Sequence, residues 1–425
     1  MKRILTLLLL LAANPVFGAL EITVSGGETT ARPIAIVPFA RPGDIPVDLA
    51  EVISSDLQRS GMFEPMPVQD MLEKPADAGQ VNYRNWRAAQ VDNVVVGALK
   101  RGANGQLAVR FQILDVLRGQ EIASFDVTVP DPRNLRGVAH YIADLVYEKL
   151  TGGPGCFNSQ IAYIATTGGP KNRLYQIVIA DADGFNPKTW ARSLEPLISP
   201  AWSPDRKHLA YVGYERGRSA VYVQSIETGE LRKLISEKGI NGAPVWSPDG
   251  KQLALTLSFG RNPDIYVMDV ATGARRQLTQ HYAIDTEPAW SPDGRQIAFT
   301  SDRGGQPQVY VVAVSGGEAK RATFQGKQNL RPRFSPDGKS LALVNVDESG
   351  YRIGLLDLAT RELRILSAGP LDESPSFSPN GAIVIYSAKG QQGNELATVT
   401  VDGRIRNRLA QPGNVYEPAW SPLIR

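Results

Sequence analysis

Three histidines, one cysteine and a recurring aspartate are the residues of this chain whose chemistry could support catalysis or metal binding. A histidine acts as a general base when a serine or cysteine nucleophile lies within hydrogen-bonding reach. His140 falls in an amphipathic segment, His208 follows a Ser-Pro-Asp turn, and His281 lies in a loop without an evident nucleophile. The chain also lacks a Gly-x-Ser-x-Gly sequence, in which a sharp turn presents a nucleophilic serine. We therefore expect no catalytic site and no enzymatic activity.

The recurring aspartates all follow Ser-Pro in tight turns: Asp205, Asp249, Asp293 and Asp337. In such a turn the proline restricts φ, the aspartate bonds to nearby backbone, and a following glycine permits positive φ. One aspartate in each turn indicates local bonding rather than ligands that converge on one ion. We therefore predict no cofactor.

These turns belong to a phrase that recurs every 43 or 44 residues. Its copies are "PAWSPD" from Pro200, "PVWSPDG" from Pro244, "PAWSPDG" from Pro288, "PRFSPDG" from Pro332, "PSFSPNG" from Pro375 and "PAWSPL" from Pro418. Each complete copy predicts two antiparallel strands, and segments such as 308–317 and 319–324 add a third and a fourth. Four strands at this period are typical of a β-propeller blade.

The last copy supplies a single strand, which alone would leave an unpaired sheet edge. Residues 160–199 contain the other three strands of a blade but no preceding phrase. The sequence therefore predicts an all-β, six-bladed propeller whose ring is closed by the C-terminal strand. A calcium ion in its channel is left open, because such sites need no motif. We expect the repeated aromatic residues to pack between blades: Trp202, Trp246, Trp290, Phe334, Phe377 and Trp420.

Residues 1–18 have the features of a secretory signal peptide: Lys2 and Arg3, a short apolar run, and small residues before a cleavage point after Gly18. The run is too short for a membrane span, which takes about 20 apolar residues. The lone Cys156 excludes an internal disulfide. The charge is nearly balanced, with 46 Lys and Arg against 43 Asp and Glu, which predicts no nucleic-acid partner.

Residues 19–155 predict a smaller α/β domain that precedes the propeller of residues 156–425. An amphipathic helix is expected from Pro46 to Gly61, and a closing helix from Asp131-Pro132 to Gly152. Three alternating segments between them, within 92–130, predict a meander of strands.

Candidate binding residues precede each marker proline, in segments that we expect to be loops beside the channel mouth. These segments are "PLIS", "INGA", "IDTE", "QNLR", "LDES" and "NVYE". Several carry acids or amides that a structural loop does not need, so we expect a partner to dock there.

The domain beginning "PIAIVPF", the "EKLTG" before the linker and the six blades together resemble the TolB family, periplasmic proteins of the Tol-Pal envelope system. The likeness covers the whole mature chain. It implies a non-enzymatic adaptor whose propeller binds the peptidoglycan-associated lipoprotein Pal and whose N-terminal segment binds the TolA C-terminal domain. It also implies roles in outer-membrane integrity and cell division, with other outer-membrane lipoproteins as further partners.

The resemblance assigns residues to both interactions. Because "NGAP" and "DTEP" lie where the family meets Pal, it assigns Pal binding to Ala243, Thr286 and Glu287, and also to Asn241 and Glu373. It assigns TolA binding to the mature N-terminal segment: Leu20, Glu21, Ile22, Thr23 and Val24. This segment alternates apolar and polar residues, which suits addition to a partner's sheet edge. The competing interpretation is an edge strand of the N-terminal domain, and both hold if the segment switches between docked and free states.

Two other function classes stay open: a propeller that gates a hydrolase, and one that binds cell-wall sugar. A sugar-binding propeller would be expected to repeat exposed aromatic residues on its loops. In these loops only Tyr282 and Tyr416 are aromatic residues of this kind.

Overall fold

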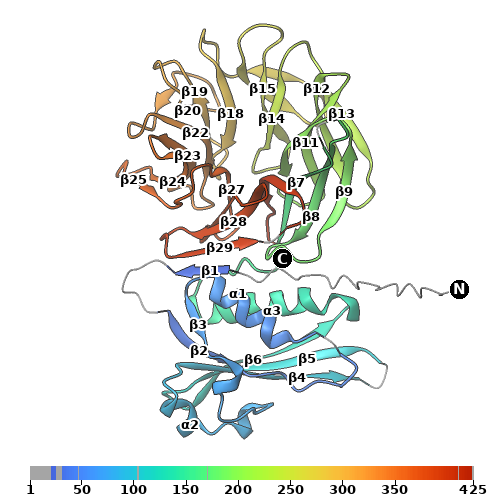
Figure 1. Cartoon of the computed structure of the whole chain (residues 1–425), viewed down its shortest axis with the longest axis vertical. Coiled ribbons are helices and arrows are strands. Elements are labelled where there is room, and N and C mark those ends of the chain that lie inside the picture. The colour runs from blue at the N-terminus through green and yellow to red at the C-terminus, as the bar shows by residue number, and fades with distance from the viewer. Residues whose placement is uncertain are drawn as a thin grey trace, which may run out of the picture.

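The computed structural model describes residues 21–24, 31–45, 47–102, 105–169, 171–409 and 411–423. A β-propeller lies above a smaller domain in which two helices cover a sheet (Figure 1). Six blades form the propeller, so the predicted fold class is confirmed. The expected signal peptide, residues 1–18, lies outside the described residues.

The N-terminal domain contains a five-stranded sheet in the order β3-β2-β4-β5-β6. Its strands are β2 (Arg32–Ile36), β3 (Phe63–Pro65), β4 (Asn93–Arg101), β5 (Leu107–Asp115) and β6 (Gln120–Val129). Strands β4 to β6 form the predicted antiparallel meander. Strand β2 pairs in parallel with both β3 and β4, which requires crossover connections such as the one that contains the first helix.

Helices α1 (Leu49–Arg59) and α3 (Leu135–Thr151) cover one face of this sheet. The carboxylate of Asp48 caps α1 by accepting from the amides of Ala50 and Glu51. A 3-10 turn (Pro132–Asn134) stands where we expected α3 to begin, and α3 ends at Gly152, whose φ is 83°.

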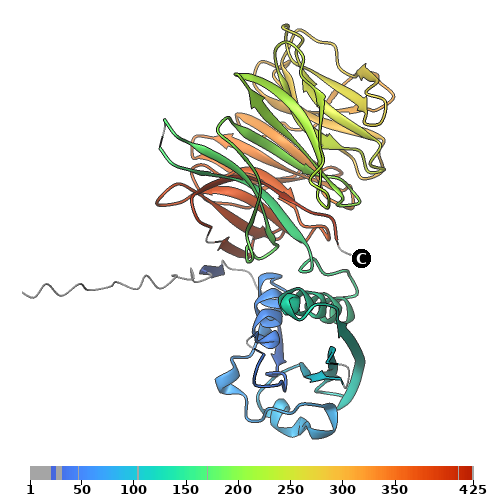
Figure 2. The same cartoon turned by 90° about the vertical axis from the view of Figure 1, so that its right-hand side faces the viewer.

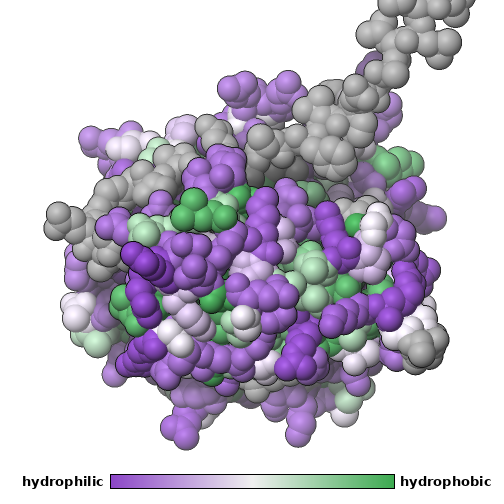
Figure 3. All heavy atoms as spheres, turned by 90° about the horizontal axis from the view of Figure 1, so that it is seen from below, coloured by the Kyte–Doolittle hydropathy of each residue, from purple (hydrophilic) through white to green (hydrophobic). Residues whose placement is uncertain are grey.

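A short helix and two 3-10 turns were not expected from the sequence. Helix α2 (Tyr83–Ala88) and the turns at Val68–Asp70 and Ala78–Gln80 lie between β3 and β4, and Trp86 buries this segment against the sheet. The face of the domain turned away from the propeller is mainly hydrophilic, with apolar side chains in small separate patches (Figure 3). Among the described residues, no helix combines the length and hydropathy needed to cross a bilayer.

We number the blades along the chain and give their strands from the channel outward. Blade I is β30 (Asn414–Trp420), β7 (Gln160–Thr167), β8 (Leu174–Asp181) and β9 (Lys188–Ser193); blade II is β10 (Leu197–Trp202), β11 (His208–Glu215), β12 (Arg218–Ser225) and β13 (Leu231–Ile235). Blade III is β14 (Asn241–Trp246), β15 (Gln252–Leu257), β16 (Asp264–Asp269) and β17 (Arg275–Gln277); blade IV is β18 (Asp285–Trp290), β19 (Gln296–Ser301), β20 (Gln308–Ala313) and β21 (Lys320–Arg321). Blade V is β22 (Gln328–Phe334), β23 (Ser340–Asp347), β24 (Gly350–Asp357) and β25 (Leu363–Ile365); blade VI is β26 (Glu373–Phe377), β27 (Ile383–Lys389), β28 (Asn394–Thr400) and β29 (Ile405–Leu409).

The ring closes as the sequence predicts, because β30 pairs antiparallel with β7 inside blade I. The amide of Ser421 donates to the carbonyl oxygen of Gln160 at 2.8 Å, and the Gln160 amide donates to the Ser421 hydroxyl at 2.9 Å. The C-terminal strand therefore supplies the innermost part of a blade that the chain began more than two hundred residues earlier.

The repeated tryptophans pack between blades, as expected. The indole N–H of Trp246 donates to the carbonyl oxygen of Ala201 in the preceding blade at 3.1 Å, and Trp202 and Trp290 make the equivalent bond. In blade I the Trp420 indole donates instead to the Ser159 hydroxyl, at 2.8 Å. Each of these four indoles is therefore buried, and its N–H group donates a hydrogen bond.

Candidate binding site at the channel mouth

The innermost strand of every blade carries the same irregularity. In blade II its pairing with β11 shifts register across Ser199-Pro200, between Ile198 and Ala201. The other shifts span Gly242/Val245, Thr286/Ala289, Leu330/Arg333, Glu373/Ser376 and Tyr416/Ala419. A proline has no N–H for the ladder, so a bulge is where a sheet accommodates one. The marker prolines thus lie inside strands, not at their starts.

The residue before each of these prolines has a left-handed backbone, although none is glycine. We call these six residues the mouth ring: Ser199, Ala243, Glu287, Arg331, Ser374 and Glu417, with φ between 45° and 57°. A left-handed conformation costs an L-residue about 1 to 2 kcal/mol. Such strain concentrates at functional sites, where the surrounding structure enforces it.

Arg331 bridges the mouth ring from blade V. Its Nε lies 2.9 Å from Oε1 of Glu287, and its Nη1 lies 3.6 Å from Oε1 of Glu417. The same Nη1 donates to the hydroxyl of Ser374. Glu287 also accepts from the hydroxyl of Thr300 at 2.9 Å. Burial alone would lower the pKa of Arg331, but Glu287 and Glu417 raise it, so the guanidinium stays charged across the mouth.

The mouth ring opens into a cavity of about 920 Å³ that extends to the Ser-Pro turns at the other end of the channel. Small or apolar residues of blades II and III line one wall, among them Ile198, Ala201 and Val245. Arg333 of blade V also lines the cavity. At its position, directly after the marker proline, the other blades carry only small or aliphatic residues: Ala201, Val245, Ala289, Ser376 and Ala419.

Four of the predicted Pal-binding residues lie at this mouth. Ala243 and Glu287 belong to the mouth ring, and Thr286 and Glu373 directly precede ring members. They lie in β14, β18 and β26, whereas we expected them in loops. The register shift next to each proline explains the difference, because the strand continues through it: Thr286 and Glu373 stay paired, whereas Ala243 and Glu287 lie in the unpaired step of the bulge.

Asn241 is placed differently, with an exposed fraction of 1%. Its Nδ2 donates to the carbonyl oxygens of Ser219 and Glu237, and its Oδ1 accepts from the Glu237 amide at 2.8 Å. The side chain fastens the start of β14 to the preceding loop and offers no surface to a partner. Contact between any of the five residues and Pal stays a prediction.

Sequence reasoning missed Arg331 and Arg333. A signal for both was present, since the fourth copy of the phrase reads "NLRPRF" where its neighbours have smaller residues on either side of the proline. Without the bulge, nothing indicated that these two positions face the channel.

The turn aspartates bond locally, as expected. Oδ1 of Asp205 accepts from the Ser203 hydroxyl at 2.6 Å and from the Lys207 amide at 3.0 Å, and Asp249, Asp293 and Asp337 repeat this arrangement. At the mouth, Arg331 already engages Glu287 and Glu417, so the arrangement does not favour a cation. Calcium in the channel stays an untested alternative.

The second candidate binding segment is β1 (Glu21–Val24), which pairs antiparallel with β29 as a fifth strand of blade VI. Its register matches Glu21 with Arg408 and Val24 with Ile405. It lies between the propeller and the helices of the N-terminal domain in two perpendicular views (Figure 1, Figure 2). The sequence left open a free strand or an edge strand of the N-terminal domain, and here the strand pairs with the propeller instead. Leu20 lies outside the described residues.

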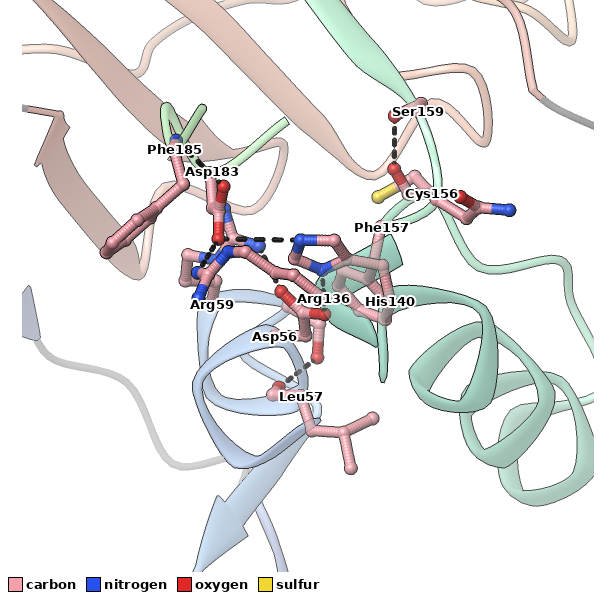
Figure 4. Close-up of polar contacts among 12 residues, drawn as sticks. Asp56, Leu57, Arg59, Arg136, His140, Cys156, Phe157, Ser159, Asp183 and Phe185 are labelled. Atoms are coloured by element: carbon pink, nitrogen blue, oxygen red, sulfur yellow. Dashed lines mark hydrogen bonds and ion pairs between the residues drawn. The ribbon is translucent and has the colours of Figure 1, made fainter. Parts of the chain in front are cut away.

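Buried charged side chains join the two domains next to this strand (Figure 4). Asp183, which follows β8 in blade I, pairs through Oδ2 with Arg136 of α3 and lies 3.6 Å from Nε2 of His140. Nδ1 of His140 lies 2.6 Å from Oδ2 of Asp56 on α1, and Asp56 also pairs with Arg59. We call these five residues the interdomain ion network.

The charges of this network support one another. Burial alone would lower the pKa of His140, but Asp56 and Asp183 raise it. Burial would raise the pKa of Asp183, but Arg59, His140 and Arg136 lower it. The protonated imidazole is therefore favoured between the carboxylates of Asp56 and Asp183.

Three members of the network are of the types that bind metal ions. Ligand atoms of Asp56, His140 and Asp183 lie within 4.8 Å of one another. Both carboxylates are already paired with arginines, and a bound cation would meet their positive charges. The arrangement therefore fits an ionic contact between domains rather than a metal site.

Comparison with known proteins shows which family this chain resembles. The family model for the TolB amino-terminal domain matches residues 20–122, and that for the TolB β-propeller domain matches residues 147–424. The Tol-Pal system protein TolB of Nitrosococcus oceani is 56% identical over 98% of this chain and 97% of its own length. The protein of that name from Methylococcus capsulatus is 57% identical over 99% of this chain and 98% of its own.

A solved structure resembles the whole fold. The crystal structure of TolB from Acinetobacter baumannii has a TM-score of 0.86 and 40% sequence identity, and the match covers 95% of this chain and 100% of that one. The likeness therefore includes both domains.

Proposed function

The chain belongs to the TolB family of Tol-Pal system proteins, and we propose on this basis that it is a non-enzymatic adaptor of the periplasm. In this proposal Pal docks at the channel mouth, through Ala243, Thr286, Glu287 and Glu373. The TolA C-terminal domain binds the segment from Leu20 to Val24. Both contacts support outer-membrane integrity and constriction at division.

The observation that carries the Pal assignment is the mouth ring. Six residues with left-handed backbone surround one cavity, and two of them are acids paired with Arg331, which makes a fixed arrangement of charged groups at the mouth. The rim includes the apolar side chain of Ile240, which lines the cavity and has an exposed fraction of 47%. An apolar rim around fixed charges suits a protein partner.

The pairing of β1 with β29 supports the TolA assignment. A strand that adds to one sheet edge presents main-chain groups that can add to another, with alternate side chains setting the register. We propose that β1 leaves β29 when TolA binds, so that docked and released states compete.

The Pal assignment is tested by calorimetry with the periplasmic domain of Pal. Glu373 is the best probe, because the described residues give its side chain no hydrogen bond or ion pair whose loss would disturb the fold. Glu373→Lys should weaken binding at least about tenfold, because it reverses a charge inside the proposed contact. The matched control is Glu318→Lys, on an exposed turn beyond blade IV's third strand. Equal dissociation constants for the two variants would place the Pal face elsewhere.

One observation favours a second candidate, binding of cell-wall sugar. Tyr282 is the most exposed aromatic residue among the described ones, and it borders a polar cavity of about 640 Å³ lined by Arg261, Asp264 and His281. Sugars commonly bind with a ring face stacked on an aromatic side chain and with their hydroxyl groups bonded to polar groups beside it. Retention on peptidoglycan fragments in the absence of Pal, and its loss in Tyr282→Ala, would support this function over the adaptor.

A further inference from the structure

The guanidinium of Arg333 lies in the channel without a charged partner. No ion pair among the described residues includes it, and its Nη1 donates a hydrogen bond to the carbonyl oxygen of the adjoining Pro332, at 2.8 Å. A guanidinium has five N–H donors, so donors remain for a ligand in the cavity. The side chain of Arg333 is partly exposed and lines the cavity. Burial lowers the pKa of Arg333, although Glu287 raises it.

The nearest acids of the mouth are already engaged. Oε1 of Glu287 pairs with Arg331, and its Oε2 accepts from the Arg331 amide at 3.0 Å. Glu417 pairs with Arg331 and accepts from the Ser199 amide. Arg333 is therefore a cation on the cavity wall that has no ion pair among the described residues, so an anion that enters the cavity can pair with it.

The shape of the channel restricts which anion can arrive. Arg331 crosses the mouth between blades IV, VI and I, whereas the ring members of blades II and III are the small residues Ser199 and Ala243. Below these two, the wall is formed by Ile198, Ala201 and Val245. A short apolar stem that ends in a planar anion fits such a passage. Arginine's fork matches a carboxylate in two parallel hydrogen bonds.

We propose that the channel binds one carboxylate side chain of the docked partner, an aspartate or glutamate that passes Ser199 and Ala243 and pairs with Arg333. The identification of the carboxylate as a side chain of Pal rests on the proposed docking of Pal. The existence of the site does not rest on it, because a free carboxylate can be used to probe Arg333. Arg333 would then determine specificity, by rejecting partners that present no acid at this point.

Calorimetry with the periplasmic domain of Pal tests the proposal on the full mature chain. Arg333→Gln should weaken binding roughly 10- to 100-fold, the range for one charge-assisted pair. Arg333→Lys keeps the charge without the fork and should fall between Arg333→Gln and wild type. The control is Arg276→Gln, whose guanidinium also bonds to a single carbonyl, that of Val314 at 2.7 Å, but on an exposed outer strand.

Thermal unfolding separates this role from a structural one. Arg333→Gln removes an unpaired cation, so its unfolding midpoint should equal or exceed that of wild type. A lower midpoint together with weaker binding would indicate a structural arginine and overturn the proposal. Equal Pal affinity for wild type and Arg333→Gln would overturn it too, while leaving Pal docking intact.

If wild type does not bind Pal, the proposed function fails and acetate decides the inference alone. The Nε–H resonance of Arg333, assigned by its loss in Arg333→Lys, should shift saturably with acetate but not with chloride at equal ionic strength. No shift with acetate would overturn the inference. A stronger response to inorganic phosphate would do the same, because the site would then take a free anion rather than a side chain.

Discussion

Replacing Asp183 by asparagine should loosen the contact between the two domains. The change removes one of the two negative charges that face Arg59, Arg136 and His140 inside the interdomain ion network. The side chain of Asp183 is only 8% exposed, so water cannot replace the lost charge. Breaking one member of a buried ion pair costs about 3 to 5 kcal/mol. Because asparagine still accepts a hydrogen bond from Arg136, we expect the lower end, about 3 kcal/mol.

Protonation of His140 gives this contact a pH dependence. The pKa of His140 is raised in the folded protein, so its stabilisation is fully present below the unfolded value of about 6.5 and is lost as pH rises through the folded value. In Asp183→Asn one of the carboxylates that raise this pKa is gone. The variant should therefore lose less stability than wild type as pH rises above about 6.5.

Chemical denaturation followed by tryptophan fluorescence measures both effects. Asp44→Asn is the control, since the pair of Asp44 with Arg101 is 2.8 Å long but has side chains 66% and 43% exposed. Exposed pairs contribute at most about 1 kcal/mol. If Asp183→Asn and Asp44→Asn unfold with equal free energies, or if wild type shows no loss of stability above neutral pH, the charge argument is wrong.

Three further changes probe other parts of the molecule. Trp420→Ala should lower the free energy of unfolding by about 3 to 5 kcal/mol, because it removes a buried indole and its hydrogen bond to Ser159 from the closing strand. An unchanged denaturation midpoint would contradict this packing. Glu287→Lys should weaken Pal binding and also lower the free energy of unfolding by about 1 to 3 kcal/mol, since Glu287 accepts a hydrogen bond from Thr300 and pairs with Arg331. Calorimetry measures the first effect and denaturation the second. A variant as stable as wild type would refute the bridging role of Arg331. Deleting Leu20 to Val24 should abolish TolA binding and leave the melting transition of the propeller nearly unchanged. It should also speed amide hydrogen exchange in β29 (Ile405–Leu409), and unaltered exchange there would mean that β1 does not protect this sheet edge.

Local rules account for most of the fold. The Ser-Pro-Asp-Gly turns use bonds between neighbouring residues, such as Ser247 with Asp249, which need no contact from elsewhere in the chain. The same holds for the cap of α1 by Asp48 and the end of α3 at Gly152. Helix α2 was missed because its six residues are too few to show an apolar period. Its stability comes from burying Trp86 against the sheet, a contact that the sequence does not reveal.

The sequence by itself determined the period of the repeats, the number of blades and the closing of the ring by the last strand, because each follows from turn chemistry and strand spacing. Tertiary structure alone decided which residues face the channel, since the left-handed mouth ring exists only where an inner strand pairs across a proline. It also placed β1 on β29 and brought Asp56, His140 and Asp183 together from three distant segments. The pKa shifts of His140 and Arg333 belong to this second class, because they arise from the loss of water and the approach of charges when those segments pack.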